Sequence, residues 1–178
     1  MATYIALLRA VNVLGKNAIK MERLRGICAD AGFDNVRTFI ASGNAIFETA
    51  RTPTRWLDDL QAAISEEVGA EISVVVRTPA QLKATVAANP FVVEQGLDPK
   101  HFHVTFLSGS PAKRHLPVLA AIDTKGDRYH HVGRELFLHC PNGYARSKLN
   151  NNALEKALSI RATTRNWNTV NRLYELAR

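Results

Sequence analysis

Short runs of apolar and β-branched residues alternate along the chain with segments in which apolar residues recur every three or four positions. The runs predict β-strands, and the segments with helical spacing predict helices. The predicted strands span residues 3–9, 35–41, 44–49, 72–77, 101–107, 126–131 and 134–139. The predicted helices span residues 20–31, 54–68, 79–88, 112–121, 149–158 and 165–177. This mixture predicts an α+β fold.

The order of the predicted elements repeats. Residues 3–77 follow the order β-α-β-β-α-β, which is the pattern of a ferredoxin-like (split βαβ) unit. From residue 101 the order is β-α-β-β-α, and a further helix stands where a last strand belongs. We therefore predict two ferredoxin-like halves packed together, residues 1–78 and residues 101–178 with the C-terminal helices. Residues 79–100 form the connecting helix and loop.

Three predicted helices start with a hydroxyl residue followed by proline, at Thr52-Pro53, Thr78-Pro79 and Ser110-Pro111. A hydroxyl N-cap accepts a hydrogen bond from a backbone N–H at the helix start, and proline at the first position has no N–H to lose. Gln81 completes a capping box with Thr78. Gly133 predicts a tight turn between the two strands that flank it.

The topology predicts a candidate site in the first half. The first two strands of a split βαβ unit are parallel, so the loop after the first strand and the turn after the second lie at one edge of the sheet. Gly15 and Gly43 allow tight turns there. Cations, amides and a hydroxyl in these two segments can hold a phosphate or carboxylate, although Asn and Gly are also good loop formers without any ligand. The predicted ligand-binding residues of this set are Arg9, Asn12, Lys16, Ser42 and Asn44.

A second candidate set lies near the C-terminus and contains Lys148, Arg165, Asn166 and Asn168. Arg165 falls in the first turn of the predicted helix 165–177, where a cation opposes the helix dipole by about 0.3–1 kcal/mol. We expect a partner that offsets this cost, either an internal carboxylate or a bound anion, because Arg forms bidentate pairs with both. If the last helix docks beside the N-terminal loop, the two sets form two walls of one anion site.

The positive charge is concentrated at one end of this basic protein, whose net charge is +7. Residues 1–78 are neutral, whereas residues 140–178 contain seven Lys or Arg against two acidic residues. Such a region can attract phosphates, nucleic acid or an acidic partner, or it can simply keep the protein soluble. We predict binding of an anionic or phosphate-bearing small ligand. The alternatives are nucleic-acid binding through the basic C-terminal face, and an enzyme of unknown reaction whose Arg/Asn cluster stabilises negative charge.

Other kinds of chemistry are not indicated. All six histidines lie between residues 101 and 139, no HExxH spacing accompanies them, and exposed strand histidines are expected. We therefore predict no metal and no cofactor. There is no GxSxG motif, no clear general base, and no Lys/Arg-Gly-Phe run of the kind found in RNA-recognition modules. The catalytic residues, if any, stay unknown.

The cysteines and the hydropathy bear on location. Cys28 and Cys140 form no CxxC motif and, without a secretion signal, predict reduced thiols and a cytoplasmic protein. No stretch approaches the length of a membrane span, so we predict no membrane partner. The sequence leaves the oligomeric state open.

Three stretches resemble a known family, the domain of unknown function 1697. They are residues 9–17 (RAVNVLGKN), 35–44 (NVRTFIASGN) and 162–169 (ATTRNWNT). The resemblance spans nearly the full chain. It implies a bacterial-type cytosolic protein built from two ferredoxin-like halves, and it implies no activity. Two residues depart from the family pattern, because Leu14 and Ser159 stand where the family usually has glycine.

Overall fold

The computed structural model describes residues 1–178 and contains two compact units. The first unit consists of Met1–Gln81 together with Leu173–Arg178, and the second consists of Leu82–Arg172. Each unit contains one four-stranded antiparallel sheet. The predicted α+β class and the two ferredoxin-like halves are therefore confirmed.

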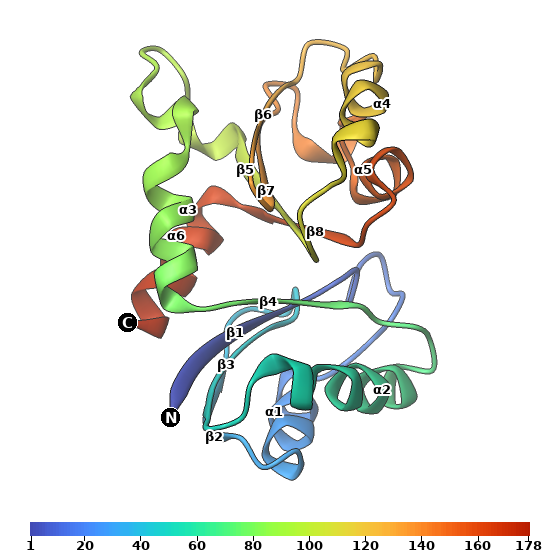
Figure 1. Cartoon of the computed structure of the whole chain (residues 1–178), viewed down its shortest axis with the longest axis vertical. Coiled ribbons are helices and arrows are strands. Elements are labelled where there is room, and N and C mark those ends of the chain that lie inside the picture. The colour runs from blue at the N-terminus through green and yellow to red at the C-terminus, as the bar shows by residue number, and fades with distance from the viewer. The chain divides into compact units, whose positions relative to one another are not determined.

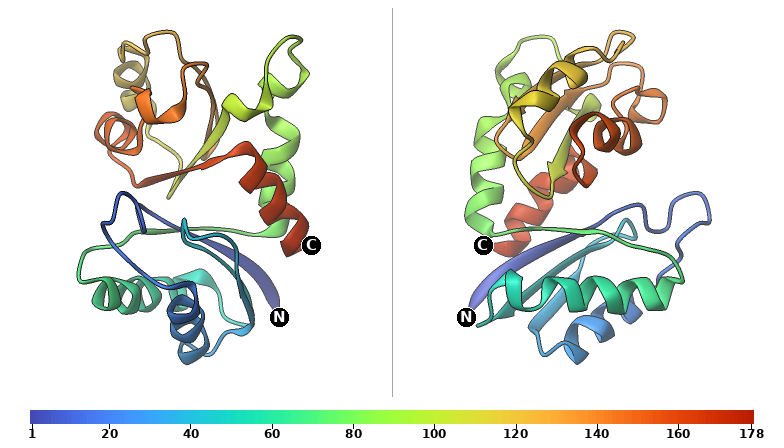
Figure 2. Two further views of the ribbon diagram at one scale, coloured as in Figure 1. Left: turned by 180° about the vertical axis from the view of Figure 1, so that it is seen from behind. Right: turned by 45° about the vertical axis from the view of Figure 1, so that its right-hand side comes forward.

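The first sheet has the strand order β2-β3-β1-β4. Both β1 and β2 run antiparallel to β3, so they are parallel to each other, as the topology predicted. The helices α1 and α2 lie side by side on one face of this sheet (Figures 1 and 2). The elements are β1 (Ala2–Leu8), α1 (Met21–Asp30), β2 (Asp34–Thr38), β3 (Asn44–Thr49), α2 (Leu57–Val68) and β4 (Val74–Arg77).

The second sheet repeats this order as β6-β7-β5-β8. The helices α4 and α5 cover one face of it (Figure 1). A tight turn at Gly133, with φ +58°, joins β6 to β7 as predicted. The elements are β5 (Phe102–Leu107), α4 (Leu116–Ala120), β6 (Arg128–Val132), β7 (Glu135–His139), α5 (Asn151–Leu158) and β8 (Ala162–Asn166).

Strand β8 corrects the prediction for the C-terminal region. Residues 162–166 pair with β5 and complete the β-α-β-β-α-β order, and the last helix, α6 (Trp167–Ala177), begins two residues later than predicted. Asn166 caps this helix, since its Oδ1 accepts a hydrogen bond from Thr169 N at 2.8 Å. The apolar pattern did not predict this strand, because the strand is short and polar and runs directly into a helix.

The remaining helix starts show which capping signals hold. Before α3 (Pro79–Ala88), Thr78 N donates to Gln81 Oε1 (2.9 Å) and Gln81 N donates to Thr78 Oγ1 (3.2 Å), so the capping box is confirmed. Thr52-Pro53 starts only a short 3-10 turn before α2. Ser110-Pro111 starts no helix, and the prediction there was wrong, because α4 begins at Leu116 with Pro117 in its first turn.

Strand register makes the two sheets equivalent position by position. Ile5 of β1 pairs with Arg77 of β4, and Val104 of β5 pairs with Arg165 of β8. Both arginines are buried, with exposed fractions of 1% and 6%. The hydrogen bond from Leu8 N to Gly43 O (2.8 Å) has its counterpart in the bond from Leu107 N to Arg134 O (2.9 Å). The two units therefore share one backbone plan.

The cores under the helices differ in chemistry. In the first unit Phe47 stacks on Phe33 with ring centroids 4.1 Å apart and meets the edge of Trp56 at 5.2 Å. The register places Leu138 of the second unit at the position of Phe47. The second core consists mainly of leucines, namely Leu107, Leu119, Leu136, Leu138, Leu149, Leu154 and Leu158. One plan is thus filled by rings in one unit and by branched aliphatic side chains in the other.

Candidate functional site

The loop after β1 and the turn between β2 and β3 are joined directly. Asn12 Nδ2 donates to Ala41 O at 2.7 Å, which ties residues 9–18 to residues 39–43. Gly43 sits at the junction with φ +83°, and a Cβ there would lie 2.4 Å from Val11 Cγ2. Only glycine fits this backbone and this space. The structure therefore brings the loop and the turn together at one edge of the sheet, as the strand order predicted.

The predicted amides act within this junction. Besides its bond to Ala41, Asn12 donates to Ile19 O (2.9 Å) and accepts from Ile19 N (2.9 Å). Asn44 is fully buried, and its Nδ2 donates to Phe39 O (2.9 Å) and to Ser42 Oγ (3.0 Å). Asn12, Ser42 and Asn44 thus hold the backbone of the two segments in place, whatever further contacts they make.

The same two segments have a strained backbone. Five non-glycine residues in them have positive φ, and these are Ala10, Asn12, Leu14, Asn17 and Ile40. Asparagine tolerates this left-handed conformation, whereas other side chains lose about 1–2 kcal/mol per residue. Leu14 has φ +49° and is 95% exposed, so its side chain gains no burial that would offset this backbone cost. Strain of this kind persists only where the surroundings impose it, and it concentrates at functional sites.

The segments and the residues next to them contain several cationic side chains. Arg9 is partly buried and Lys16 is exposed. Lys20 and Arg37 lie in the same stretches, and residues 9–20 and 35–47 contain no Asp or Glu. These stretches of sequence therefore supply cations and no acidic residue of their own. We call residues 9–18 and 39–43 the joined loops; they are the candidate anion site of the first unit.

The second predicted set has a different local structure from the one expected. Arg165 lies on β8 and not in a helical turn, so the helix dipole gives no reason for a bound anion there. Its Nη1 donates to Thr163 Oγ1 (2.8 Å) and Thr164 O (2.9 Å), and burial lowers the pKa of the guanidinium to about 10. Lys148 and Asn168 are exposed. These residues belong to the second unit and the joined loops to the first, so a single shared site stays a prediction.

A cavity of about 550 Å³ between α1 and α2 has the wrong charge for an anion. Its lining includes Asp30, Asp59, Glu66 and Glu67. The Arg23 guanidinium in this cavity pairs with Glu67 at 2.9 Å. The cavity therefore does not compete with the joined loops as a place for a phosphate.

One histidine of the second unit has a different environment from the one predicted. His139 was expected to be exposed, yet its side chain is only 8% exposed and packs against the Phe91 and Phe102 rings, with centroids 5.8 Å away. Burial, more than the nearby Arg128, lowers the pKa of this histidine. The signal was present in residues 136–138 (LFL), which are apolar on both faces of the strand just before His139 and so indicate an enclosed strand.

The chain forms neither a metal site nor an aromatic surface for RNA on its second sheet. No group of three His, Cys, Asp or Glu side chains is placed to hold a metal ion. The phenylalanines of the second sheet, Phe102, Phe106 and Phe137, are at most 1% exposed. An RNA-recognition module needs exposed aromatics on its sheet to stack on bases. This sheet offers no such platform.

No helix has the length and apolar character needed to cross a bilayer.

The fold defines an α+β protein made of two ferredoxin-like units, the first with two joined loops at one sheet edge. A model of the family described as "Protein of unknown function (DUF1697)" matches residues 1–137, and the chain belongs to this family. The block 162–169, which contributed to the resemblance, lies outside the matched residues.

Solved structures support the fold alone. The structure of the conserved bacterial protein SP0830 from Streptococcus pneumoniae aligns with a TM-score of 0.80 over 99% of each chain, at 18% sequence identity. No curated protein matches the chain. The family and the structural neighbour therefore establish the architecture, and the function must be argued from the residues.

Proposed function

We propose that the joined loops of the first unit bind an anionic, phosphate-bearing small ligand. The observation that carries the proposal is the combination of a strained, hydrogen-bonded backbone with basic side chains and no carboxylate in residues 9–20 and 35–47. Arg9 and Lys16 supply the charge, and an Arg guanidinium suits phosphate because its N–H groups form a planar fork.

The rigidity of the loops favours binding. A segment already fixed by Asn12 and Asn44 loses little freedom when a ligand arrives, so more of the contact energy appears as affinity. Two backbone bonds within the loop add to this rigidity, because Asn12 N donates to Asn17 O (3.1 Å) and Lys16 N donates to Val13 O (2.9 Å).

The proposal is tested by calorimetric titration of the full chain with pyrophosphate at low ionic strength. The double variant Arg9→Ala/Lys16→Ala is expected to weaken binding at least tenfold, because each charge-assisted hydrogen bond contributes about 1.5–3 kcal/mol. Lys113→Ala, which removes an exposed cation of the second unit, is the matched control and leaves the affinity unchanged. Equal affinity for the wild type and the double variant contradicts the proposal.

The salt dependence of the same titration separates a small-ligand site from nucleic-acid binding. Backbone binding to nucleic acid releases many counterions, so its affinity falls steeply as salt rises. A site with two cations has a shallow dependence. Lys148→Ala and Asn168→Ala test whether the second predicted set, with Arg165 and Asn166, takes part.

We also keep the cytoplasmic location as a proposal, which the free thiols of Cys28 and Cys140 support.

A further inference from the structure

Residues 89–96 form a strap across the sheet of the second unit. Its short 3-10 helix, Pro90–Val93, is capped by Asn89, whose Oδ1 accepts from Phe91 N at 3.1 Å. Phe91 is the buried anchor of the strap, with 3% of its side chain exposed, whereas Val93 is 84% exposed. The strap is therefore fastened at few points.

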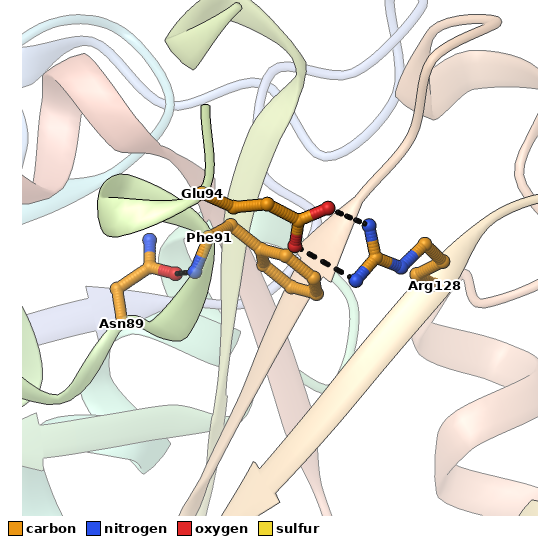
Figure 3. A network of polar contacts seen from close by, with 4 residues as sticks. All are labelled: Asn89, Phe91, Glu94 and Arg128. Atoms are coloured by element: carbon orange, nitrogen blue, oxygen red, sulfur yellow. Dashed lines mark hydrogen bonds and ion pairs between the residues drawn. The ribbon is translucent and has the colours of Figure 1, made fainter. Parts of the chain in front are cut away.

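One ion pair fastens the strap to β6. Both carboxylate oxygens of Glu94 bond to Arg128, at 2.8 and 2.9 Å (Figure 3). The Arg128 guanidinium also lies over the Phe91 ring, 5.1 Å from its centroid. About half of each charged side chain remains accessible to solvent, with exposed fractions of 50% and 42%. An accessible pair of this kind is screened by water, so it closes the strap without locking it.

His139 lies under this fastening. It is the direct partner of Arg128 in the β6–β7 register, and its ring packs against Phe91. Its Nδ1 is buried and has no hydrogen-bond partner, and the amide nitrogen of Asn89 is in the same condition. A neutral imidazole tolerates this apolar surrounding, whereas an imidazolium has two N–H donors and a charge to satisfy.

We propose that the strap is a pH-sensitive latch, closed over His139 while its imidazole is neutral and released when the imidazole takes up a proton from solvent.

The charged groups around His139 favour this direction. Burial lowers its pKa most, followed by the positive charge of Arg128 from β6 and by His101 from the turn before β5. Glu94 on the strap and Asp127 before β6 oppose these effects without reversing them. A histidine with a lowered pKa in the folded state stabilises that state above the ordinary pKa of about 6.5, and this contribution is lost as the pH falls below it.

Release relieves two unfavourable contacts at once. It moves Phe91 away from the new charge, and it admits water to the buried Nδ1 of His139. The aromatic surface of Phe91 and Phe102 then becomes accessible, which makes the open state detectable.

Amide hydrogen exchange of the full chain tests the latch. The amide of Phe91 is buried in the closed strap, where it donates to Asn89 Oδ1, and release exposes it to water. After correction for the intrinsic pH dependence of exchange, its protection is expected to fall at least tenfold between pH 7.5 and pH 5. Peptides from α1 and α2 of the first unit are the control, and their protection from exchange is expected to stay the same. Unchanged protection of the strap at pH 5 overturns the proposal.

Three variants test whether His139 is the group that takes up the proton. His139→Phe keeps an aromatic ring that cannot be protonated, so the step in protection disappears, while His101→Phe retains it. Glu94→Gln removes one charge of an accessible pair, so protection of the strap at pH 7.5 is expected to fall by no more than about fivefold. If His139→Phe does not fold, His139→Gln takes its place as a side chain that cannot be protonated. The latch is wrong if the variant at position 139 keeps the wild-type step, or if His101→Phe abolishes it.

Discussion

The two units share a strand order and a register, yet they differ at the sheet edge where the first strand ends. In the first unit the loop after β1 is bonded to the β2–β3 turn, and Val11 fills the space beside Gly43. In the second unit the position of Gly43 is occupied by Arg134, and the turn glycine, Gly133, has open space around it. The sheet plan does not require the junction, because the second unit keeps the same register with Arg134 in place of Gly43. This is why we place function there.

The largest expected effect tests the difference between the two cores. Phe47→Ala removes a ring that stacks on Phe33 and meets Trp56, and a buried Phe→Ala change costs about 3–5 kcal/mol. Leu138→Ala, at the equivalent position, is the matched variant and is expected to cost less, because no aromatic pair is broken with it. Urea unfolding followed by circular dichroism gives both values. A larger loss for Leu138→Ala would show that the aromatic cluster is not the stronger core.

A smaller effect tests the junction itself. Gly43→Ala combines a left-handed backbone, which costs about 1–2 kcal/mol, with a collision that costs about 1–3 kcal/mol, and thus a total of about 2–5 kcal/mol. Gly133→Ala has only the backbone cost, since nothing lies within 4 Å of its Cβ position. A Cβ at position 43 would meet both Val11 of the loop and Leu8 of β1. The difference between the two variants in free energy of unfolding therefore measures how tightly the turn packs against these two side chains. Equal losses would mean that this packing is absent.

The smallest effect concerns one non-glycine residue with positive φ in each unit. Leu14 and Ser159 have φ of +49° and +54°. Replacing either with glycine is expected to raise the free energy of unfolding by about 0.5–1 kcal/mol. Glycine removes the cost of the left-handed backbone, but part of this gain is offset because glycine is more flexible in the unfolded chain. Ala84→Gly, at an exposed position inside α3, is the control and lowers stability by about 1 kcal/mol. Thermal unfolding of the three variants checks both signs.

Sequence patterns were sufficient for the first unit and less so for the second. The helices of the first unit have 10 and 12 residues, long enough for apolar periodicity to be clear, whereas α4 has five. Ser110-Pro111 resembled a helix start but leads only into a loop, because capping residues also stabilise turns without a helix. Strand β8 was missed since Thr163 and Arg165 are polar, although both are buried.

The candidate site was predictable to the level of topology. Parallel β1 and β2 had to place the loop and the turn at one edge, and they do. The roles of Asn12 and Asn44 were not predictable, because an asparagine amide bonds equally well to a backbone carbonyl or to a ligand, and only the path of the chain decides which is near. The burial of His139 likewise depends on Phe91, which lies 48 positions away in the sequence and was not part of any predicted element.

Amide chemical-shift mapping during addition of pyrophosphate tests the central claim most directly, because it shows which sheet edge receives the anion. We predict saturable shifts at residues 10–17 and 41–43, with none at the corresponding edge of the second unit, residues 108–113 and 133–134. Shifts confined to the second unit, or none at concentrations up to 10 mM, about 2.7 kcal/mol of binding free energy, would contradict the account.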